Sequence, residues 1–185
     1  MVENLSDLEI IELILKGQKS NFAVLVSRYQ QAAYKLALGI LLQKADAEDA
    51  VSDAFIKAYM ALPGCRKDTN FNSWFLKITY NCCLDILRKR KKFQSFNGLE
   101  DTIELASDED PLQDLVDREH KEGLWQALNK LNHEERGAVI LKYYNEASYL
   151  EIARTLNWPM GTVASRLSRA RDKLRNLMEG GSTDE

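Results

Sequence analysis

Apolar residues recur every three or four positions through long stretches of the chain, which is the period of an amphipathic helix. β-branched residues do not cluster, and only three prolines occur among 185 residues, so helices are favoured over strands. The pattern predicts an all-α protein. The two clearest stripes are Phe22, Leu25, Val26, Tyr29, Ala33, Leu36, Ala37 and Ile40, and then Phe71, Trp74, Phe75, Ile78 and Cys82.

Polar capping residues and helix breakers divide the first half of the chain into four predicted helices. Ser6, with Glu9 three residues later, forms a capping box for a short first helix, and Asn21 is expected to cap the second. The third is predicted over residues 46–62, where a Pro-Gly pair ends it. The fourth begins near Asn70 or Asn72 and ends in the basic run at 88–92.

The second half of the chain is also predicted to be helical. One helix carries Leu115, Leu124, Trp125 and Leu128, and the next runs from about His133 to Tyr144 with Val139, Ile140 and Tyr143 facing inward.

The last two predicted helices form a helix-turn-helix. Ser148 and Glu151 make a capping box for the helix SYLEIARTL, and Asn157 ends it because asparagine tolerates the left-handed backbone conformation. Pro159 then precedes a basic helix, as in motifs whose second helix enters the DNA major groove. Its apolar stripe is Val163, Leu167, Ala170, Leu174 and Leu177.

Charge is distributed unevenly along the chain, whose net charge is −3. Residues 94–117 hold eight Asp/Glu and no Lys/Arg, whereas residues 1–93 carry a net charge of +4 and residues 118–185 a net charge of +1. A segment with a charge block, a Gly, a Pro and no apolar period is typical of a linker. We therefore predict two small helical domains, residues 1–93 and 118–179, joined by an acidic flexible linker at 94–117 and followed by a tail at 180–185.

Cysteine usage and hydropathy narrow the class of protein further. Cys65, Cys82 and Cys83 form no C-x-x-C pair and lie far from His120 and His133 in the sequence, so we expect reduced thiols, no metal site and no cofactor. The start of the chain is acidic and the longest apolar runs are too short to span a bilayer. We expect a cytoplasmic protein without membrane insertion.

The last helix carries the residues that a duplex DNA reader needs. A small residue and a hydroxyl in its first turn suit a phosphate, small side chains can meet base edges, and the cations can reach phosphates on both sides of a groove. The candidate DNA-binding residues are Gly161, Thr162, Ala164, Ser165, Arg166, Ser168, Arg169, Arg171 and Lys173.

A second candidate surface lies between residues 66 and 92. Cations, amides and aromatic rings on one surface suit single-stranded DNA, because cations hold the backbone while rings and polar pockets hold unstacked bases. The candidates are Arg66, Lys67, Asn70, Asn72, Lys77, Tyr80, Asn81 and Arg88. Trp74 shares the apolar stripe and is expected in the core, whereas the sequence leaves open whether Tyr80 is buried.

The segment DAEDAVSDAFIKAY places acidic and apolar side chains on adjacent helical turns. Such a face can dock on another protein. The candidate docking residues are Asp49, Ser52, Asp53, Phe55 and Ile56.

These motifs together resemble the extracytoplasmic-function (ECF) sigma factors. Residues 131–178, with the strings SYLEIA and PMGTVASRLSRAR, resemble region four of that family. Residues 22–92, notably DAEDAVSDAFIKAY and FNSWFLKITYNCCLDILRKRK, resemble region two. Two differences from the family pattern are Asn157 in place of the usual turn glycine, and Gly137, which interrupts a helix at a cost of about 1 kcal/mol relative to alanine.

The resemblance implies a bacterial transcription initiation factor and not an enzyme. It implies that the Asp49–Phe55 face contacts the clamp helices of the largest subunit of core RNA polymerase. The surface from Arg66 to Arg88 would recognise and help melt the minus-ten promoter element, and the last helix would read the minus-thirty-five element. The family also implies an anti-sigma factor as a further partner, and a linker that threads toward the polymerase active-site channel.

Two other functional classes remain open at this point. A conventional helix-turn-helix regulator would bind duplex sites by itself, usually as a dimer. An enzyme is the third reading, although the sequence holds no P-loop, metal cluster or nucleophile motif.

Overall fold

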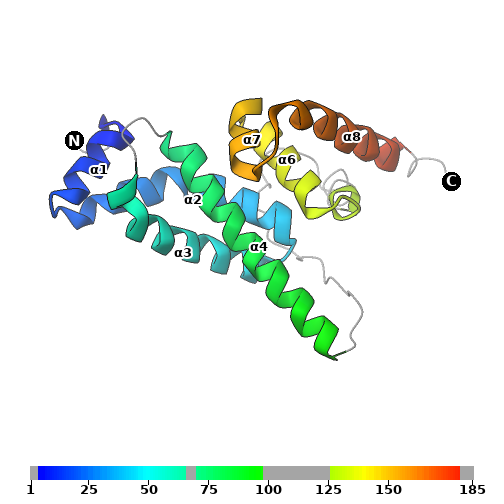
Figure 1. Cartoon of the computed structure of the whole chain (residues 1–185), viewed down its shortest axis with the longest axis horizontal. Coiled ribbons are helices and arrows are strands. Elements are labelled where there is room, and N and C mark those ends of the chain that lie inside the picture. The colour runs from blue at the N-terminus through cyan, green and yellow to red at the C-terminus, as the bar shows by residue number, and fades with distance from the viewer. Residues whose placement is uncertain (1–3, 66–69, 98–125, 180–185) are drawn as a thin grey trace.

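The computed structural model describes residues 4–65, 70–97 and 126–179, and all regular structure in these residues is helical. This confirms the all-α prediction. Figure 1 shows two groups of helices along the chain. The N-terminal module contains α1 (Asp7–Leu15), η2 (Lys19–Asn21), α2 (Phe22–Leu41), α3 (Lys44–Ala61), η3 (Leu62–Gly64) and α4 (Phe71–Asn97); the C-terminal module contains α6 (His133–Tyr143), α7 (Tyr149–Leu156) and α8 (Met160–Glu179).

The core of the N-terminal module lies between α2, α3 and α4, which pack pairwise against one another. Aromatic rings fill its centre: Phe75 stacks on Phe71 with centroids 5.9 Å apart and lies 4.4 Å from the ring of Phe55. The predicted capping box of Ser6 and Glu9 starts α1. The N-terminal helix is fixed on α2 by an ion pair of 2.7 Å between Asp7 and Arg28.

Two predicted helix ends of this module differ in the structure, and a third, the start of α2 after Asn21, lies where predicted but without the expected capping bond. Asn21 makes no side-chain capping bond; it closes the short helix η2, and its amide donates to Gln18 Oε1 instead. The third helix begins at Lys44, because the extended backbone lies at Gln43 and not at Asp46. The fourth helix continues to Asn97, so its last four residues fall within the segment predicted as linker. Lysine and arginine are good helix formers, so the basic run does not end a helix.

Two helices of the C-terminal module, α6 and α7, have well-defined starts. Capping boxes begin both α6, through Asn132 and Glu135, and α7, through Ser148 and Glu151 as predicted. Asn157 adopts the predicted left-handed conformation with φ of 57°. Tyr143, predicted to face inward, is exposed in the last turn of α6. Buried Val163, Leu167 and Ala170 hold α8 on the module, whereas Leu177, near its end, is exposed.

The two modules share one hydrophobic core. Helix α6 packs on α2, and α7 packs on the first turns of α4, as Figure 1 shows. The core cluster of the N-terminal helices therefore continues through Ile140, Ile152 and Leu156 of the C-terminal helices. The predicted linker from residue 98 onward, most of the helix at 115–128 and the tail lie outside the described residues. Within the described ranges, no helix combines the length and apolarity needed to cross a membrane.

Candidate nucleic-acid and polymerase interfaces

Helix α8 presents one buried and one exposed face. Gly161, Ala164, Ser165, Arg169, Arg171 and Lys173 are exposed, and Thr162, Arg166 and Ser168 are partly buried. A methyl group added at Gly161 would meet no protein atom within 4 Å, so packing inside the protein does not require glycine there. The missing side chain leaves the first turn of the helix open to an external ligand. This is the placement that a backbone contact to a phosphate needs.

Two of the predicted DNA-binding cations are engaged with other side chains of the C-terminal module. Arg166 forms an ion pair with Glu134 and lies over the ring of Trp158 at 4.4 Å. Lys173 Nζ contacts Glu135 Oε1 at 2.7 Å. Both partners belong to the first turn of α6, so these pairs brace α8 against α6. Arg169 and Arg171 instead project from the exposed side of the helix.

The residues predicted to contact single-stranded DNA do not all lie at the surface. Asn81 and Arg88 are exposed on α4, and Lys77 is half-buried. Tyr80 is only 4% exposed. Burial raises its pKa to about 12, with a further contribution from the nearby Glu134 carboxylate. The open question about Tyr80 is therefore answered: its ring is covered where the C-terminal module approaches α4. Arg66 and Lys67 lie outside the described residues.

The two candidate amides at the start of α4 have distinct surroundings. Asn70 Oδ1 accepts a hydrogen bond of 3.1 Å from the Ser73 amide and so caps the helix, as expected. Its Nδ2 donates to Glu151 of the C-terminal module at 3.4 Å. Asn72 is half-buried, and among the described residues its Oδ1 meets no hydrogen-bond donor. A ligand that reaches this unsatisfied oxygen could donate a hydrogen bond to it. Trp74 is partly buried against the core, as predicted.

Helix α3 displays an acidic and apolar stripe. Asp49, Ser52, Asp53 and Ile56 are exposed, and Met60 extends the same stripe by one turn. Met60 was not among the predicted docking residues, although it continues the helical spacing of the other four. Phe55 does not belong to this stripe. It is 9% exposed and packs on Phe75, because it falls on the buried side of the helix with Ala47, Ala54 and Ala58.

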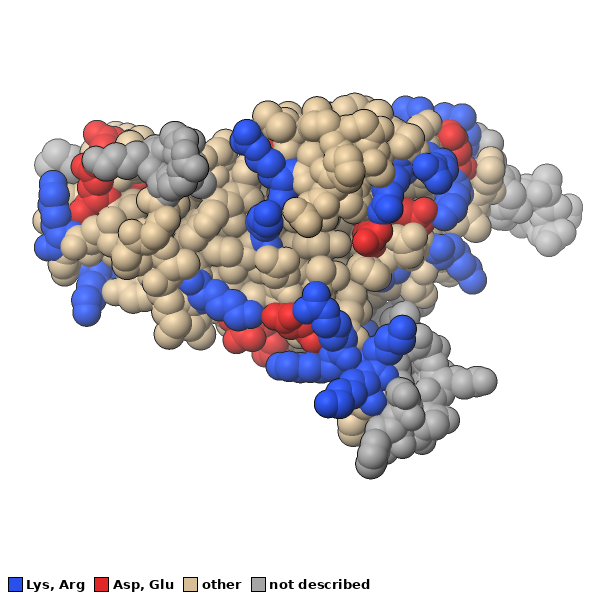
Figure 2. Space-filling model, in the orientation of Figure 1, with Lys and Arg blue, Asp and Glu red and all other residues tan. Residues whose placement is uncertain are grey.

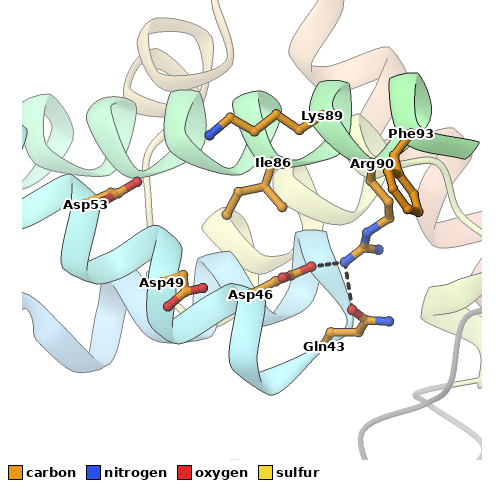
Figure 3. Close-up of a pocket in the computed structure, with 8 residues that line it drawn as sticks. All are labelled: Gln43, Asp46, Asp49, Asp53, Ile86, Lys89, Arg90 and Phe93. Atoms are coloured by element: carbon orange, nitrogen blue, oxygen red, sulfur yellow. Dashed lines mark hydrogen bonds and ion pairs between the residues drawn. The ribbon is translucent and has the colours of Figure 1, made fainter. Parts of the chain in front are cut away.

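The acidic stripe borders a groove of about 690 Å³ between α3 and the projecting end of α4. Figure 3 shows Arg90 reaching across from α4, where it donates to Gln43 Oε1 at 2.9 Å and pairs with Asp46. Asp49 and Asp53 extend the acidic wall away from this bridge. The opposite wall adds Ile86, Lys89 and Phe93, which the sequence analysis did not single out. Carboxylates beside apolar groups suit a basic amphipathic helix.

The basic side chains are spread over several surfaces rather than gathered in one place. In Figure 2, Lys and Arg cluster along the projecting end of α4 and around α8, and a group of acidic side chains lies beside the basic end of α4. Among the described residues, no group of three or more His, Cys, Asp or Glu side chains is arranged to hold a metal ion. Cys82 and Cys83 are buried, and burial raises the pKa of both thiols.

Comparison with known proteins places both modules in one family. Residues 25–93 match the family described as Sigma-70 region 2, and residues 121–174 match Sigma-70, region 4. The ECF RNA polymerase sigma factor SigW of Bacillus subtilis is 31% identical, over 91% of this chain and 94% of its own length. The ECF RNA polymerase sigma-E factor of Escherichia coli K12 is 30% identical, over 97% of both chains.

Solved structures show the same fold. The sigma factor RpoE of Bartonella quintana, in complex with the anti-sigma factor NepR, has a TM-score of 0.75 at 26% identity and covers 89% of this chain and 99% of its own. CnrH, in complex with the cytosolic domain of CnrY, has a TM-score of 0.71 at 24% identity, over 95% and 99% of the two chains, which shows the fold alone. These relatives exclude the stand-alone regulator and the enzyme as readings of the chain. The protein is a member of the ECF RNA polymerase sigma factor family, and it directs RNA polymerase to promoters.

Proposed function

We propose that three surfaces of this sigma factor have separate functions, one in binding polymerase and two in recognising promoter elements. The stripe on α3 docks on the clamp helices of the largest polymerase subunit. The start of α4, together with the segment that precedes it, recognises the minus-ten element. The exposed face of α8 reads the minus-thirty-five element as duplex DNA.

The α3 stripe is the observation that best supports this division. Exposed apolar side chains that are grouped on one surface and flanked by polar residues mark sites that a partner covers. Ile56 is 55% exposed and Met60 is exposed beside it, next to Asp49 and Asp53. A partner helix with basic residues flanking an apolar stripe would complement both the charge and the apolar surface.

The exposed residues of α8 support duplex recognition. The side chains of Arg169 and Arg171 reach outward on either side of a face that carries Ser165 and the open backbone at Gly161. Cations at the edges of a recognition helix bind phosphates, and small polar groups between them contact base edges. Arg166 and Lys173 are paired to α6 and therefore orient the helix in addition to supplying positive potential.

The proposed minus-ten surface combines Asn70, Asn72, Lys77, Asn81 and Arg88 with Arg66 and Lys67 of the preceding segment, whereas Tyr80 is buried in the described structure. Asn81 and Arg88 are exposed on the same face of α4, two turns apart, and Asn72 carries the unsatisfied buried acceptor. Amides and cations at this density suit an unpaired strand, whose bases expose hydrogen-bonding edges that a duplex hides.

An anti-sigma factor is a further proposed partner. NepR binds the sigma factor RpoE, which resembles this chain over both modules. A protein that covers the α3 stripe would compete with polymerase for it. Copurification from the native host would reveal such a partner, and recovery of the chain as a free monomer would speak against it.

The docking assignment is tested by charge reversal on α3. Asp53→Lys places a cation in the acidic wall of the groove and should lower the affinity for core polymerase at least tenfold. Glu48→Lys makes the same charge change at an exposed position of the same helix that does not line the groove, so it controls for net charge. Core binding is measured by fluorescence anisotropy of the labelled chain. Equal affinities of the two variants would remove the groove from the proposal.

A further inference from the structure

The cationic side chains of α8 fall into two groups with different surroundings. Arg166 and Lys173 are seven residues apart, so they lie two turns apart along one edge of the helix. Each forms an ion pair with the first turn of α6. The exposed Arg169, Arg171 and Arg175 form no ion pair within the part of the chain that the structure describes. The edge that faces α6 therefore carries cations whose charge is already balanced.

Arg166 is held from two sides. Its guanidinium pairs with the Glu134 carboxylate and lies 4.4 Å from the ring centroid of Trp158, in the turn between α7 and α8. The side chains of Arg166 and Glu134 are 38% and 39% exposed. Water and DNA can therefore reach the pair, but the carboxylate and the indole ring together fix where the arginine points.

Glu135 makes two kinds of contact at once. Its two carboxylate oxygens accept from Lys173 Nζ at 2.7 and 3.0 Å. Oε2 also accepts a hydrogen bond of 3.2 Å from the Asn132 backbone amide, which completes the capping box of α6. A capping box forms equally well with glutamine at this position, so the start of α6 does not require the negative charge. The charge of Glu135 is matched to Lys173 instead.

A balanced cation contributes little to binding DNA of arbitrary sequence. Such binding comes from the counterions released when protein cations neutralise phosphates. An exposed ion pair is weak, so a phosphate can draw the cation away from its partner. The carboxylate stays behind, however, within the screening length of about 10 Å at 0.1 M salt, and it repels the same phosphate. The net charge of each pair, which is zero, therefore decides its contribution.

We propose that Glu134 and Glu135 set the promoter selectivity of α8 by balancing the charges of Arg166 and Lys173. On DNA of arbitrary sequence a helix can turn any cationic edge toward the phosphates, whereas base contacts fix its orientation on a promoter element. Balancing the edge that faces α6 therefore weakens non-specific binding more than specific binding. The two glutamates act through the cations that they hold and are positioning residues. This inference rests on the proposed reading of the minus-thirty-five element by α8.

Glu134→Gln and Glu135→Gln test the proposal because glutamine keeps the size of the side chain and an oxygen that accepts hydrogen bonds. Each variant should release one cation for phosphate binding. The slope of log affinity against log salt for a non-promoter duplex should then become steeper by about one, which is a gain of about tenfold in affinity at 50 mM salt. Fluorescence anisotropy of a labelled non-promoter duplex, titrated with the full chain, measures both quantities.

Glu146→Gln is the matched control for net charge. Glu146 is exposed in the loop after α6 and makes no ion pair with any described residue. It lies at the opposite end of a helix about 16 Å long, beyond the screening length. This variant should keep the slope and affinity of the wild type. An equal gain from Glu146→Gln would assign the effect to net charge alone and overturn the proposal.

Removing both charges of a pair separates charge balance from a structural effect. The double variant Glu135→Gln/Lys173→Gln should return non-promoter binding to the wild-type slope and affinity. If it binds as tightly as Glu135→Gln alone, the gain does not come from Lys173 and the proposal is wrong. Glu134→Gln/Arg166→Gln makes the same comparison at the other pair, so the test does not depend on the folding of one variant.

Selectivity itself is measured with the holoenzyme on two duplexes. One carries a promoter of this factor whose start site has been mapped, and in the other the minus-thirty-five element is replaced. The ratio of the two affinities should fall by up to about tenfold in Glu134→Gln and Glu135→Gln, the factor by which non-promoter binding rises. An unchanged ratio would overturn the selectivity role.

Arg169→Ala in the same assay distinguishes the two levels of the argument. If it leaves the ratio unchanged, the proposed reading of the minus-thirty-five element by α8 fails, and the role of the glutamates fails with it. If it lowers the ratio while the glutamine variants do not, only the role of the glutamates is wrong.

Discussion

Phe55 and Ile56 are adjacent on α3 but should respond to alanine substitution in opposite ways. The Phe55 ring is 9% exposed, lies 4.4 Å from the Phe75 centroid and 6.2 Å from that of Phe22, and occupies the centre of the N-terminal module. Truncating a buried phenylalanine removes its transfer free energy and leaves a cavity, at a cost of about 3–5 kcal/mol. Ile56 is 55% exposed, so its truncation should change the free energy of unfolding by about 0.5 kcal/mol.

The two substitutions should also separate stability from docking. Domains of this size are commonly stable by about 5–15 kcal/mol, so Phe55→Ala should remain largely folded at low temperature while its urea midpoint falls. Its folded fraction should bind core polymerase with nearly wild-type affinity. Ile56→Ala should keep the wild-type midpoint and lose about 1–2 kcal/mol of binding free energy, as expected for an apolar side chain covered by a partner.

Urea unfolding followed by circular dichroism gives the stabilities, and titration against core polymerase at 10 °C gives the affinities. If Phe55→Ala unfolds like the wild type but binds polymerase poorly, Phe55 is a docking residue, as predicted from the sequence alone, and not a core residue. The distinction between the two residues also fails if Ile56→Ala costs as much stability as Phe55→Ala.

Two further predictions concern the C-terminal module. Arg169→Ala should weaken binding of holoenzyme to the minus-thirty-five element and reduce the slope of log affinity against log salt by about one, as for the loss of one phosphate contact; an unchanged slope would assign Arg169 to solvent. Burial lowers the pKa of His133 below its ordinary value of 6.5. Below pH 6.5 the unfolded chain therefore binds a proton more readily than the folded chain, and the free energy of unfolding should decrease as the pH falls. His133→Gln should remove this dependence, and a wild-type-minus-variant difference that is constant from pH 7.5 to 5.5 would contradict the assignment.

The sequence correctly predicted those structural features that depend only on neighbouring residues. The capping boxes at Ser6 and Ser148 and the left-handed Asn157 depend only on residues within one turn, and the structure contains all three. The second helix begins after Asn21 as predicted, although the Asn21 side chain makes no capping bond. The start expected at Asp46 differs because Gln43 supplies the change in backbone direction. Capping propensity identifies residues that can start a helix, but the position that does so also depends on packing.

The surroundings of single side chains were less predictable because they depend on both modules. Tyr80 lies on a helix face that is apolar on one side and polar on the other, so periodicity could not decide its burial. The C-terminal module decides it, through the approach of Glu134 and Arg166. The prediction for Phe55 was wrong for a different reason. It was assigned to the docking face with its neighbours, although the spacing of the alanines in α3 already indicated that the side of the helix carrying Phe55 is buried.

Three residues that lower the stability of their own module are explained by the contacts that they make with the other module. Gly137 within α6 and Gly39 within α2 lower the stability of their helices relative to alanine, and the buried Arg136 carries a desolvation cost. In the structure, Gly137 packs against Ile40, Gly39 admits Ile140, and Arg136 caps α2. Because the family pattern describes each region separately, Gly137 reads as a departure from it. The clustering of the three residues on one surface instead indicates that the two modules are adapted to each other as well as to polymerase and DNA.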